Sequence, residues 1–326
     1  MKKTTVKASA DIAFIKYWGK KNEMLRLPEN GSISMKVSGL DTTTTVEFDS
    51  SLSSDQVIID TQKQKKEIAR VVKHLDRIRK LADVKTFARV ESQNSFPRAS
   101  GLSSSGSGFA ALTLAGTKAL SLNLSEKELS ILARQGSGTA CRCVCGGFVE
   151  WLDGITSDTS YSQTIFPANH WDLRDVVVIV DQGQKKVSTT EGHTTAQSSP
   201  FFAERQNRIK NKIEQVKKYI GQKNFTKLGE IIEAEALEFH SILLTSQPGL
   251  IAWYPGTVQV MLAVQNFRKQ GVECYFTINT GFNIHVLTLP ESEEKVKDHM
   301  ESLSLVQNTI VGKVGGEPQV LSKHLF

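Results

Sequence analysis

A run of glycines and hydroxyl side chains, PRASGLSSSGSGFAAL at residues 97–112, has the composition of a phosphate-binding loop. Glycines let the backbone come close to an anion. The helix expected to begin near Ser107 adds unpaired N–H groups and the positive end of its dipole. The P-loop pattern G-x-x-x-x-G-K-[ST] is absent from the sequence. Taken alone, the segment is equally compatible with a flexible turn before an ordinary core helix.

Three further segments combine glycines with polar side chains where apolar strands or helices begin or end. Such places bring charged and hydroxyl groups to the edges of rigid elements, where chemistry is usually done. One of the three carries a single arginine, whose planar guanidinium suits a carboxylate or a phosphate. The segments are 10–20 (ADIAFIKYWGK, with Asp11, Lys16, Tyr17 and Lys20), 135–148 (QGSGTACRCVCGGF, with Arg142) and 277–283 (TINTGFN).

Helical and strand-like patterns alternate along the chain, which predicts α/β or α+β layers. The helix after Asn123 has a clear start signal, because Ser125 can cap it and Glu128 stands at the capping-box position. We expect helices at about 64–82, 107–120, 125–135, 201–221, 224–244, 255–270 and 291–303, and strands at about 42–48, 56–59, 86–91, 175–180, 274–278 and 283–289.

The chain has 326 residues, more than a single hydrophobic core usually serves, so two domains are expected. A polar stretch rich in hydroxyls runs from 181 to 199 and follows a buried strand. We therefore predict a boundary within it, with an N-terminal domain at 1–184 and a C-terminal domain at 185–326.

Composition narrows the class of protein and its surroundings. The formal net charge is +6, and the densest basic segments, 63–80 and 205–218, carry apolar residues at helical spacing. Amphipathic helices explain them better than a nucleic-acid surface. No apolar run approaches the ~18 residues of a membrane span, and no signal peptide is evident. The cysteines lack zinc-site spacing, so we expect free thiols in the cytoplasm, with neither nucleic acid nor membrane as partner.

Three motifs resemble those of one enzyme family. IKYWGK at 15–20 is similar to its N-terminal signature, GLSSSGSGFAAL at 101–112 to its nucleotide loop, and GSGTACR-x3-GGF at 136–148 to its GSGSACR-x3-GGF. The chain thereby resembles the mevalonate diphosphate decarboxylases of the GHMP kinase superfamily, along nearly its whole length and in the same order.

This resemblance implies an α+β two-domain GHMP-kinase-like fold. Its N-terminal half would resemble ribosomal S5 domain 2 and bind the nucleotide, its C-terminal half would be ferredoxin-like, and the active site would lie in the cleft between them. It also implies ATP and Mg²⁺ as cofactors, a phosphorylated mevalonate as substrate, and a homodimer. Family members phosphorylate the 3-hydroxyl of mevalonate 5-diphosphate and then lose that phosphate together with CO₂, which gives isopentenyl diphosphate.

Roles carried over from the resemblance fall into three groups. The catalytic group is Asp11, Lys20, Arg142 and Asn279, and the substrate-binding group is Tyr17, Lys20, Ser137, Thr139, Arg142 and Ser188. The nucleotide-binding group is Ser92, Asn94, Gly101, Ser103, Ser104, Ser105, Gly106, Ser107 and Lys185, with Ser105 also a magnesium ligand.

Three departures from the family pattern fall within the site. Asn279 replaces the catalytic aspartate, Asp11 replaces an asparagine, and Thr190 replaces an arginine that helps to bind the substrate diphosphate. Loss of a general base typically costs about 10²–10⁴-fold. We hypothesise that Asp11 takes over part of the missing electrostatic role. Loss of a phosphate clamp weakens binding of a second phosphate by about 2–3 kcal/mol, which favours mevalonate 5-phosphate.

We interpret the chain as an ATP- and Mg²⁺-dependent decarboxylase of mevalonate 5-diphosphate or 5-phosphate. Three alternatives stay open: a mevalonate-type 3-kinase that does not decarboxylate, an ATP-independent decarboxylase of a 3-phosphorylated mevalonate, and an inactive ligand-binding paralogue. An introduced Asp→Asn change at 279 would explain neither Asp11 nor Thr190.

Overall fold

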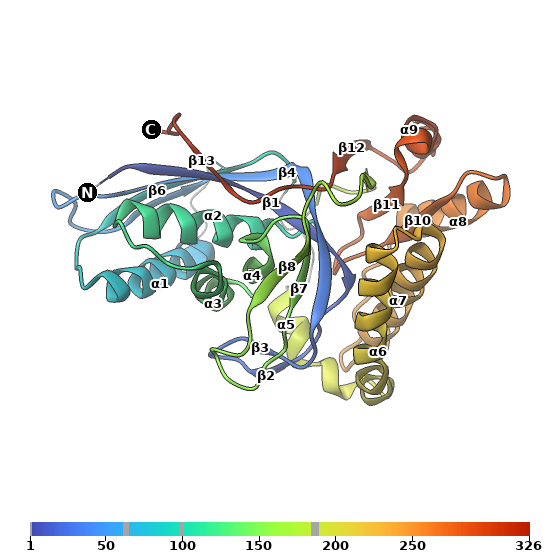
Figure 1. The fold of residues 1–326 in the computed structure, drawn as a ribbon, viewed down its shortest axis with the longest axis horizontal. Coiled ribbons are helices and arrows are strands. Elements are labelled where there is room, and N and C mark those ends of the chain that lie inside the picture. The colour runs from blue at the N-terminus through green and yellow to red at the C-terminus, as the bar shows by residue number, and fades with distance from the viewer. Residues whose placement is uncertain (1, 61–64, 98–100, 184–188) are drawn as a thin grey trace.

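Two large sheets, each with its own helices, organise the part of the chain that the structure describes. The computed structural model describes residues 2–60, 65–97, 101–183 and 189–326 (Figure 1). The larger sheet and helices α1–α4 form one half of the molecule, and helices α6–α9 with the smaller sheet form the other (Figure 1). Among the residues described, no helix combines the length and the apolarity needed to cross a membrane.

The larger sheet is built on two long strands, β1 (Thr4–Ile15) and β4 (Ser32–Phe48), which pair antiparallel. β-branched residues favour this conformation, and β4 contains the run 42–46, four threonines and a valine. The path through the sheet is β13-β1-β4-β6-β5, and β7 leaves it to pair with β4 and β8. The other strands are β5 (Gln56–Ile59), β6 (Ala88–Asn94), β7 (Phe148–Trp151), β8 (Ser162–Phe166) and β13 (Gln319–Leu321), with the separate hairpin β2 (Lys20–Asn22) and β3 (Leu27–Pro28).

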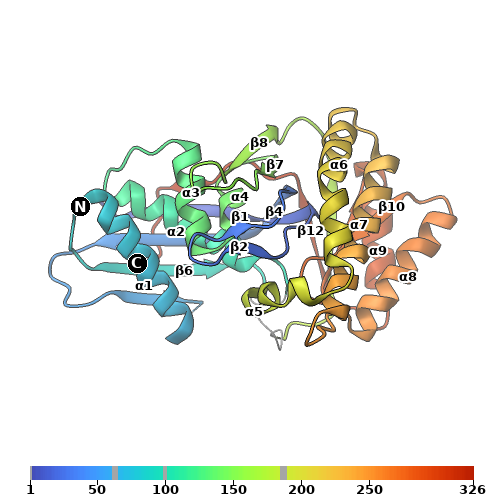
Figure 2. The same ribbon diagram turned by 90° about the horizontal axis from the view of Figure 1, so that it is seen from below.

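Helices cover one face of this sheet (Figure 2). They are α1 (Lys65–Ala82), α2 (Ser104–Ala119), α3 (Glu126–Gly136) and the short α4 (Ala140–Cys143). Helix α2 is buried along most of its length, and α1 buries the predicted apolar stripe that includes Leu75 and Ile78. The predicted capping box of Ser125 and Glu128 is confirmed at the start of α3.

The smaller sheet has four antiparallel strands in the order β10-β11-β9-β12. Its strands are β9 (Arg174–Ile179), β10 (Cys274–Thr277), β11 (Ile284–Thr288) and β12 (Asn308–Lys313). The helices of this half are α6 (Phe202–Gly221), α7 (Phe225–Thr245), α8 (Pro255–Lys269) and α9 (Glu293–Glu301), with the 3₁₀ turn η2 (Pro290–Ser292). The short α5 (Thr189–Thr194) and the 3₁₀ turn η1 (Ala196–Ser198) precede α6, and α5 lies beside the larger sheet (Figure 1).

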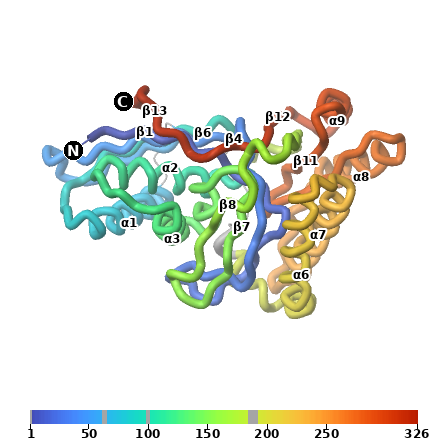
Figure 3. Tube along the Cα trace, viewed as in Figure 1, coloured from blue at the N-terminus to red at the C-terminus, as the bar shows by residue number. Residues whose placement is uncertain are grey.

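The division between the sheets does not coincide with the predicted boundary at 184/185. Strand β9 precedes that boundary but pairs with β11 and β12 in the smaller sheet. Strand β13 crosses back, so that the last segment of the chain lies beside β1 (Figure 3). The predicted boundary therefore falls after the first strand of the second half.

A buried ionic network fastens the two halves to each other. Glu235 of α7 accepts hydrogen bonds from the backbone N–H of Lys16 at 3.2 Å and from the guanidinium of Arg205 in α6 at 2.5 Å. Arg205 also donates to the carbonyl of Lys16 at 2.7 Å, and Lys212 binds the second oxygen of Glu235 at 2.9 Å. The side chains of Glu235 and Arg205 are fully buried. Such a pair is costly to break, because removal of one partner leaves the other charge buried.

We expect Glu235→Gln to lower the free energy of unfolding by about 3–5 kcal/mol, because Arg205 would lose its buried counter-charge. Urea denaturation measures the difference. Glu230→Gln, which removes an exposed ion pair with Lys227 on the same helix, is the matched control and should change stability by less than about 1 kcal/mol. Equal effects of the two substitutions would contradict this view of the network.

Candidate active site

The serine-rich loop meets the glycine turn that follows β10. Gly101 has a φ of +96°, and a Cβ atom there would lie only 2.6 Å from the Cα of Gly281. Position 101 thus needs glycine, both for its backbone conformation and for the space beside Gly281. Beside this contact, the side-chain amide of Asn279 donates to the hydroxyl of Ser103 at 3.3 Å. Ser103 itself adopts a left-handed conformation, with φ 58°, directly before α2.

The other two polar segments join the same place. The hydroxyls of Ser105 and Ser137 lie 3.2 Å apart, which links the serine loop to the loop of Arg142. The side-chain oxygen of Asn279 accepts the backbone N–H of Ala13 from β1 at 3.5 Å. Segments far apart in the sequence therefore converge at the junction of the two halves.

Asp11 and Arg142 form a buried ion pair. The guanidinium donates through Nε to Asp11 at 2.6 Å and through Nη1 to Ser32 at 2.7 Å. Lys36 is the direct partner of Asp11 across β1 and β4. Burial alone would raise the pKa of Asp11, but Arg142 and Lys36 hold it below its ordinary value. With one carboxylate and two cations, this cluster carries a net positive charge.

Asn279 takes no part in this ion pair. Its side chain contacts the backbone N–H of Ala13, two residues from Asp11 on β1. The backbone carbonyl of Asn279 accepts a hydrogen bond from Nε2 of His240 at 2.9 Å. Burial lowers the pKa of His240 to about 3, so the ring is neutral and holds the turn in place.

Tyr17 and Lys20 follow the end of β1 in the sequence. The ring of Tyr17 packs edge-on to Trp151 with centroids 4.6 Å apart, and burial raises its pKa, which keeps the phenol protonated. Lys20 binds Glu23 at 2.9 Å. Burial lowers the pKa of Lys20, and the positive charges of Arg26 and Arg70 lower it further. Lys20, Arg26 and Arg70 therefore form a group of neighbouring cations.

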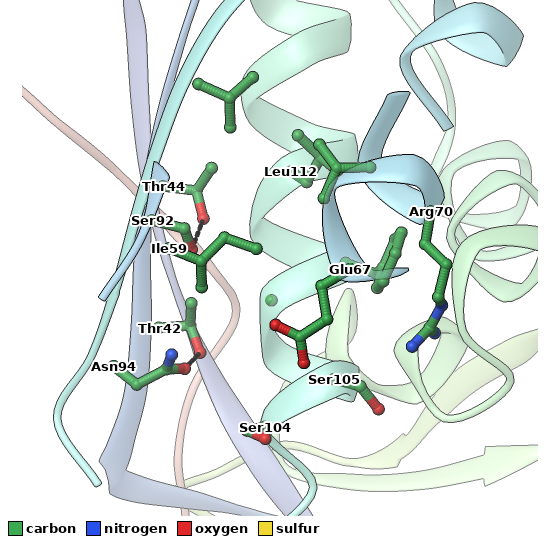
Figure 4. A pocket seen from close by; sticks show the side chains of 14 residues that line it. Thr42, Thr44, Ile59, Glu67, Arg70, Ser92, Asn94, Ser104, Ser105 and Leu112 are labelled. Carbon is green, nitrogen blue, oxygen red and sulfur yellow. Dashed lines mark hydrogen bonds between the residues drawn. The ribbon is translucent and has the colours of Figure 1, made fainter. Parts of the chain in front are cut away.

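A pocket opens between the sheet and helices α1 and α2. Figure 4 shows its polar walls: the pairs Thr42–Asn94 and Thr44–Ser92, joined by hydrogen bonds of 2.7 and 2.8 Å, belong to β4 and β6. Apolar side chains form the remainder of the lining, and Glu67 and Arg70 enter from α1. All lining residues are Thr42, Thr44, Ile59, Glu67, Arg70, Val71, Val90, Ser92, Asn94, Ser104, Ser105, Gly108, Phe109 and Leu112.

The residues predicted for the nucleotide do not all reach this pocket. Ser92, Asn94, Ser104 and Ser105 line it, whereas Gly101 and Ser103 lie at the contact with the glycine turn. Two others lie beneath the loop: Ser107 is fully buried and bonds Thr42 at 2.6 Å, and Gly106 packs on Thr139. Lys185 and Ser188 fall outside the described residues, as does the side chain of Thr190.

Sequence reasoning missed several residues of the region. The threonines of β4 were recognised only as strand formers, and Glu67 and Arg70 only as the solvated face of a helix. Lys36 had no motif to mark it, since its pairing with Asp11 depends on strand register. The expected free thiols are confirmed, because Cys141, Cys143, Cys145 and Cys274 are all unpaired and buried.

Comparison with known proteins gives a consistent result along the chain. The family of diphosphomevalonate decarboxylase-like N-terminal domains matches residues 8–162, and that of mevalonate 5-diphosphate decarboxylase C-terminal domains matches residues 175–321. The second match begins at Asp175, the second residue of β9.

Individual relatives agree with the family matches. A diphosphomevalonate decarboxylase from Candida albicans is 33% identical and covers 91% of this chain and 87% of its own. A phosphomevalonate decarboxylase from Haloferax volcanii is 31% identical and covers 98% of each. A solved structure of MDDEF in complex with MVAPP, AMPPCP and magnesium has a TM-score of 0.91 at 38% identity, covering 98% of this chain and 99% of that one. The predicted two-domain α+β fold of the GHMP kinase type is confirmed by this similarity.

The Asp11–Arg142 pair predicts a specific pH dependence of stability. Because the pKa of Asp11 is lower in the folded chain than in the unfolded one, its contribution is complete above the unfolded value of about 3.9 and is lost as the pH falls through the folded value. We expect the free energy of unfolding to fall less steeply in Asp11→Asn than in the wild type below about pH 4. Urea denaturation at a series of pH values measures this, and equal slopes would contradict it.

Proposed function

The chain belongs to the diphosphomevalonate decarboxylase family, which makes it an ATP-dependent decarboxylase of the mevalonate route, and we propose that its substrate is a mevalonate phosphorylated at C5. One observation carries the assignment of residues: the serine loop, the Arg142 loop, the end of β1 and the turn of Asn279 meet at one junction. A phosphoryl donor and a carboxylate-bearing acceptor bound there would lie side by side.

ATP and Mg²⁺ are the cofactors, and we propose that the pocket of Figure 4 receives the nucleotide. Its apolar wall suits a purine ring, and the hydroxyls of β4 and β6 suit a ribose. Ser104 and Ser105, in the first turn of α2, would contact the phosphates at the positive end of the helix dipole. The hydroxyl of Ser105 and the carboxylate of Glu67 line the same pocket, an oxygen donor set that suits phosphate-bound Mg²⁺.

We assign the two ends of the substrate to the two cationic groups. Arg142 makes no hydrogen bond through Nη2 to any described residue, and the cluster of Asp11, Arg142 and Lys36 keeps a net positive charge for a carboxylate. Lys20, Arg26 and Arg70 would neutralise the phosphate or diphosphate at C5. Tyr17, Ser137 and Thr139 would contact the substrate between these ends.

The chemistry follows from this placement. The 3-hydroxyl oxygen attacks the γ-phosphorus of ATP, the bond from that phosphorus to the β–γ bridging oxygen breaks, and ADP leaves. The C3–O bond then breaks with loss of phosphate. The electrons of the bond to the carboxylate carbon form the new double bond as CO₂ departs. Positive charge that develops at C3 is stabilised by negative charge nearby.

Asp11 is the fixed negative charge that we propose for this task. Asn279 carries none, and Asp11 stands two residues from the Ala13 that Asn279 contacts. Its pKa lies below the ordinary value, so it stays ionised throughout the working pH range. A carboxylate held so firmly as an anion is a poor proton acceptor, and its role is therefore electrostatic.

Two observations bear on the number of phosphates at C5, and they point in opposite directions. The Lys20, Arg26 and Arg70 group suits a diphosphate, whereas threonine at 190 favours a monophosphate, the substrate named for the Haloferax volcanii relative. We further propose that the enzyme works in the cytoplasm as a homodimer, as the family resemblance implies.

A parallel assay tests the proposed function. We expect equal amounts of ADP and CO₂ from Mg-ATP with mevalonate 5-diphosphate or 5-phosphate, and neither product with mevalonate alone. ADP without CO₂ would instead establish a 3-kinase. CO₂ release from a 3-phosphorylated mevalonate without ATP would establish the ATP-independent decarboxylase, and absence of all products would favour a ligand-binding paralogue.

Asp11→Asn tests the electrostatic role. We expect it to abolish CO₂ release, because the cation at C3 would develop without a neighbouring negative charge. The unfolding curve of the same variant shows whether it is folded under assay conditions. Asp41→Asn is the control, since Asp41 lies on β4 and bonds Ser9. Near-normal turnover by a folded Asp11→Asn would rule the role out.

A further inference from the structure

Lys16 is a buried lysine that the assigned roles leave without a task. It stands directly after β1, and only 3% of its surface is exposed. Its ammonium donates to the carbonyl of Ala13 at 2.9 Å and to the hydroxyl of Thr277 at 2.5 Å. Ala13 is also the residue whose N–H binds the side chain of Asn279. The side chains of Lys16 and Asn279 therefore contact the same residue at the junction of the four motifs.

The charges around Lys16 do not provide it with a dedicated counter-ion. Among the described residues, no carboxylate forms an ion pair with the Nζ of Lys16. Glu235 accepts a hydrogen bond from the backbone N–H of Lys16, not from its side chain. The oxygens of Glu235 are occupied by cations of α6. The groups that face Lys16 are Glu235 and His240 from α7, Arg205 and Lys212 from α6, and Arg142 from α4, while Asp11 on its own strand is committed to Arg142.

The balance of these effects favours the neutral amine. Burial is the largest, and the positive charges of Arg205, Lys212 and Arg142 act in the same direction, against Glu235. Together they lower the pKa of Lys16 to about 7. A carboxylate at position 279 would reach the same Ala13 and raise that value, whereas the amide of Asn279 does not.

We propose that Lys16 is the proton carrier of the reaction, and that asparagine at 279 is what frees its amine to act as one. This proposal rests on the proposed function. It assigns to a lysine the proton transfer for which the family pattern has an aspartate, and it leaves to Asp11 only the electrostatic role.

The proton balance closes over the two steps. In the first, the lone pair of the Lys16 amine takes the proton of the 3-hydroxyl as its oxygen bonds to the γ-phosphorus and ADP leaves. In the second, the C3–O bond breaks and the ammonium of Lys16 returns that proton to the departing phosphate. Hydrogen phosphate, CO₂ and the alkene result, and the amine is regenerated. A group that titrates near the working pH serves as base and then as acid.

Lys16→Arg separates a base from a mere cation, because a guanidinium keeps the charge but does not give up its proton. We expect ADP formation to fall by about 10²–10⁴-fold. Asn279→Asp in the Lys16→Arg background should restore part of the rate by supplying a carboxylate base. Lys16→Met, close in size and neutral, should be as inactive as Lys16→Arg. Lys217→Gln, which loses ion pairs with Glu150 and Glu214, is the control and should keep the wild-type rate.

The pH dependence gives a second readout, with opposite signs for the two roles. If the neutral amine of Lys16 acts as the base, the rate of wild-type ADP formation at saturating Mg-ATP rises as the pH increases through about 7. If the ammonium acts only as a cation, the rate falls over the same range. The ¹³Cε resonance of Lys16, assigned by its loss in Lys16→Arg, should titrate over the same range. An ordinary lysine pKa in this titration would overturn the proposal, whatever the activity.

The outcomes distinguish the two proposals. If the wild type forms product and Lys16→Arg forms it at the same rate, the role of Lys16 is overturned and the proposed function stands. A wild type that forms no product from any phosphorylated mevalonate would overturn both.

Discussion

The structure depends on one buried carboxylate, that of Glu235. It binds the backbone of Lys16 from the first half and the side chains of Arg205 and Lys212 from the second, so it joins the halves at the point where β1 ends. Its negative charge raises the pKa of Lys16, but burial and the surrounding cations outweigh it. The contact that stabilises the arrangement of the two halves is thus also the one that leaves a lysine without its own counter-ion beside the reaction.

Relative to the family pattern, negative charge has moved from the turn after β10 to the interior of the larger sheet. Asp11 brings a carboxylate to β1, and Lys36 and Arg142 on either side of it keep the region positive. Asn279 keeps the geometry of the turn through hydrogen bonds to Ala13 and Ser103 without contributing charge. The changes at 11 and 279 are coherent as one redistribution, in which electrostatic stabilisation and proton transfer fall to different side chains.

Much of this could be predicted from the sequence, and the exceptions have physical causes. Helices with strong apolar periodicity, such as α1, α6 and α7, lie within a residue or so of their expected bounds. Strand β13, with three residues, carries too few for alternation to mark it. The pairing of Asp11 with Lys36 depends on strand register, and so does the position of the threonines in the pocket wall. Local sequence patterns do not encode strand register.

Strand β13 has a consequence for the way in which this chain is made. The edge of β1 to which it pairs is complete only when residues 319–321 have left the ribosome, long after the remainder of the larger sheet. Until then, β1 presents an uncovered row of backbone donors and acceptors, the kind of edge on which nascent chains aggregate. The larger sheet therefore finishes late in synthesis, and it needs the second half of the chain to close its edge.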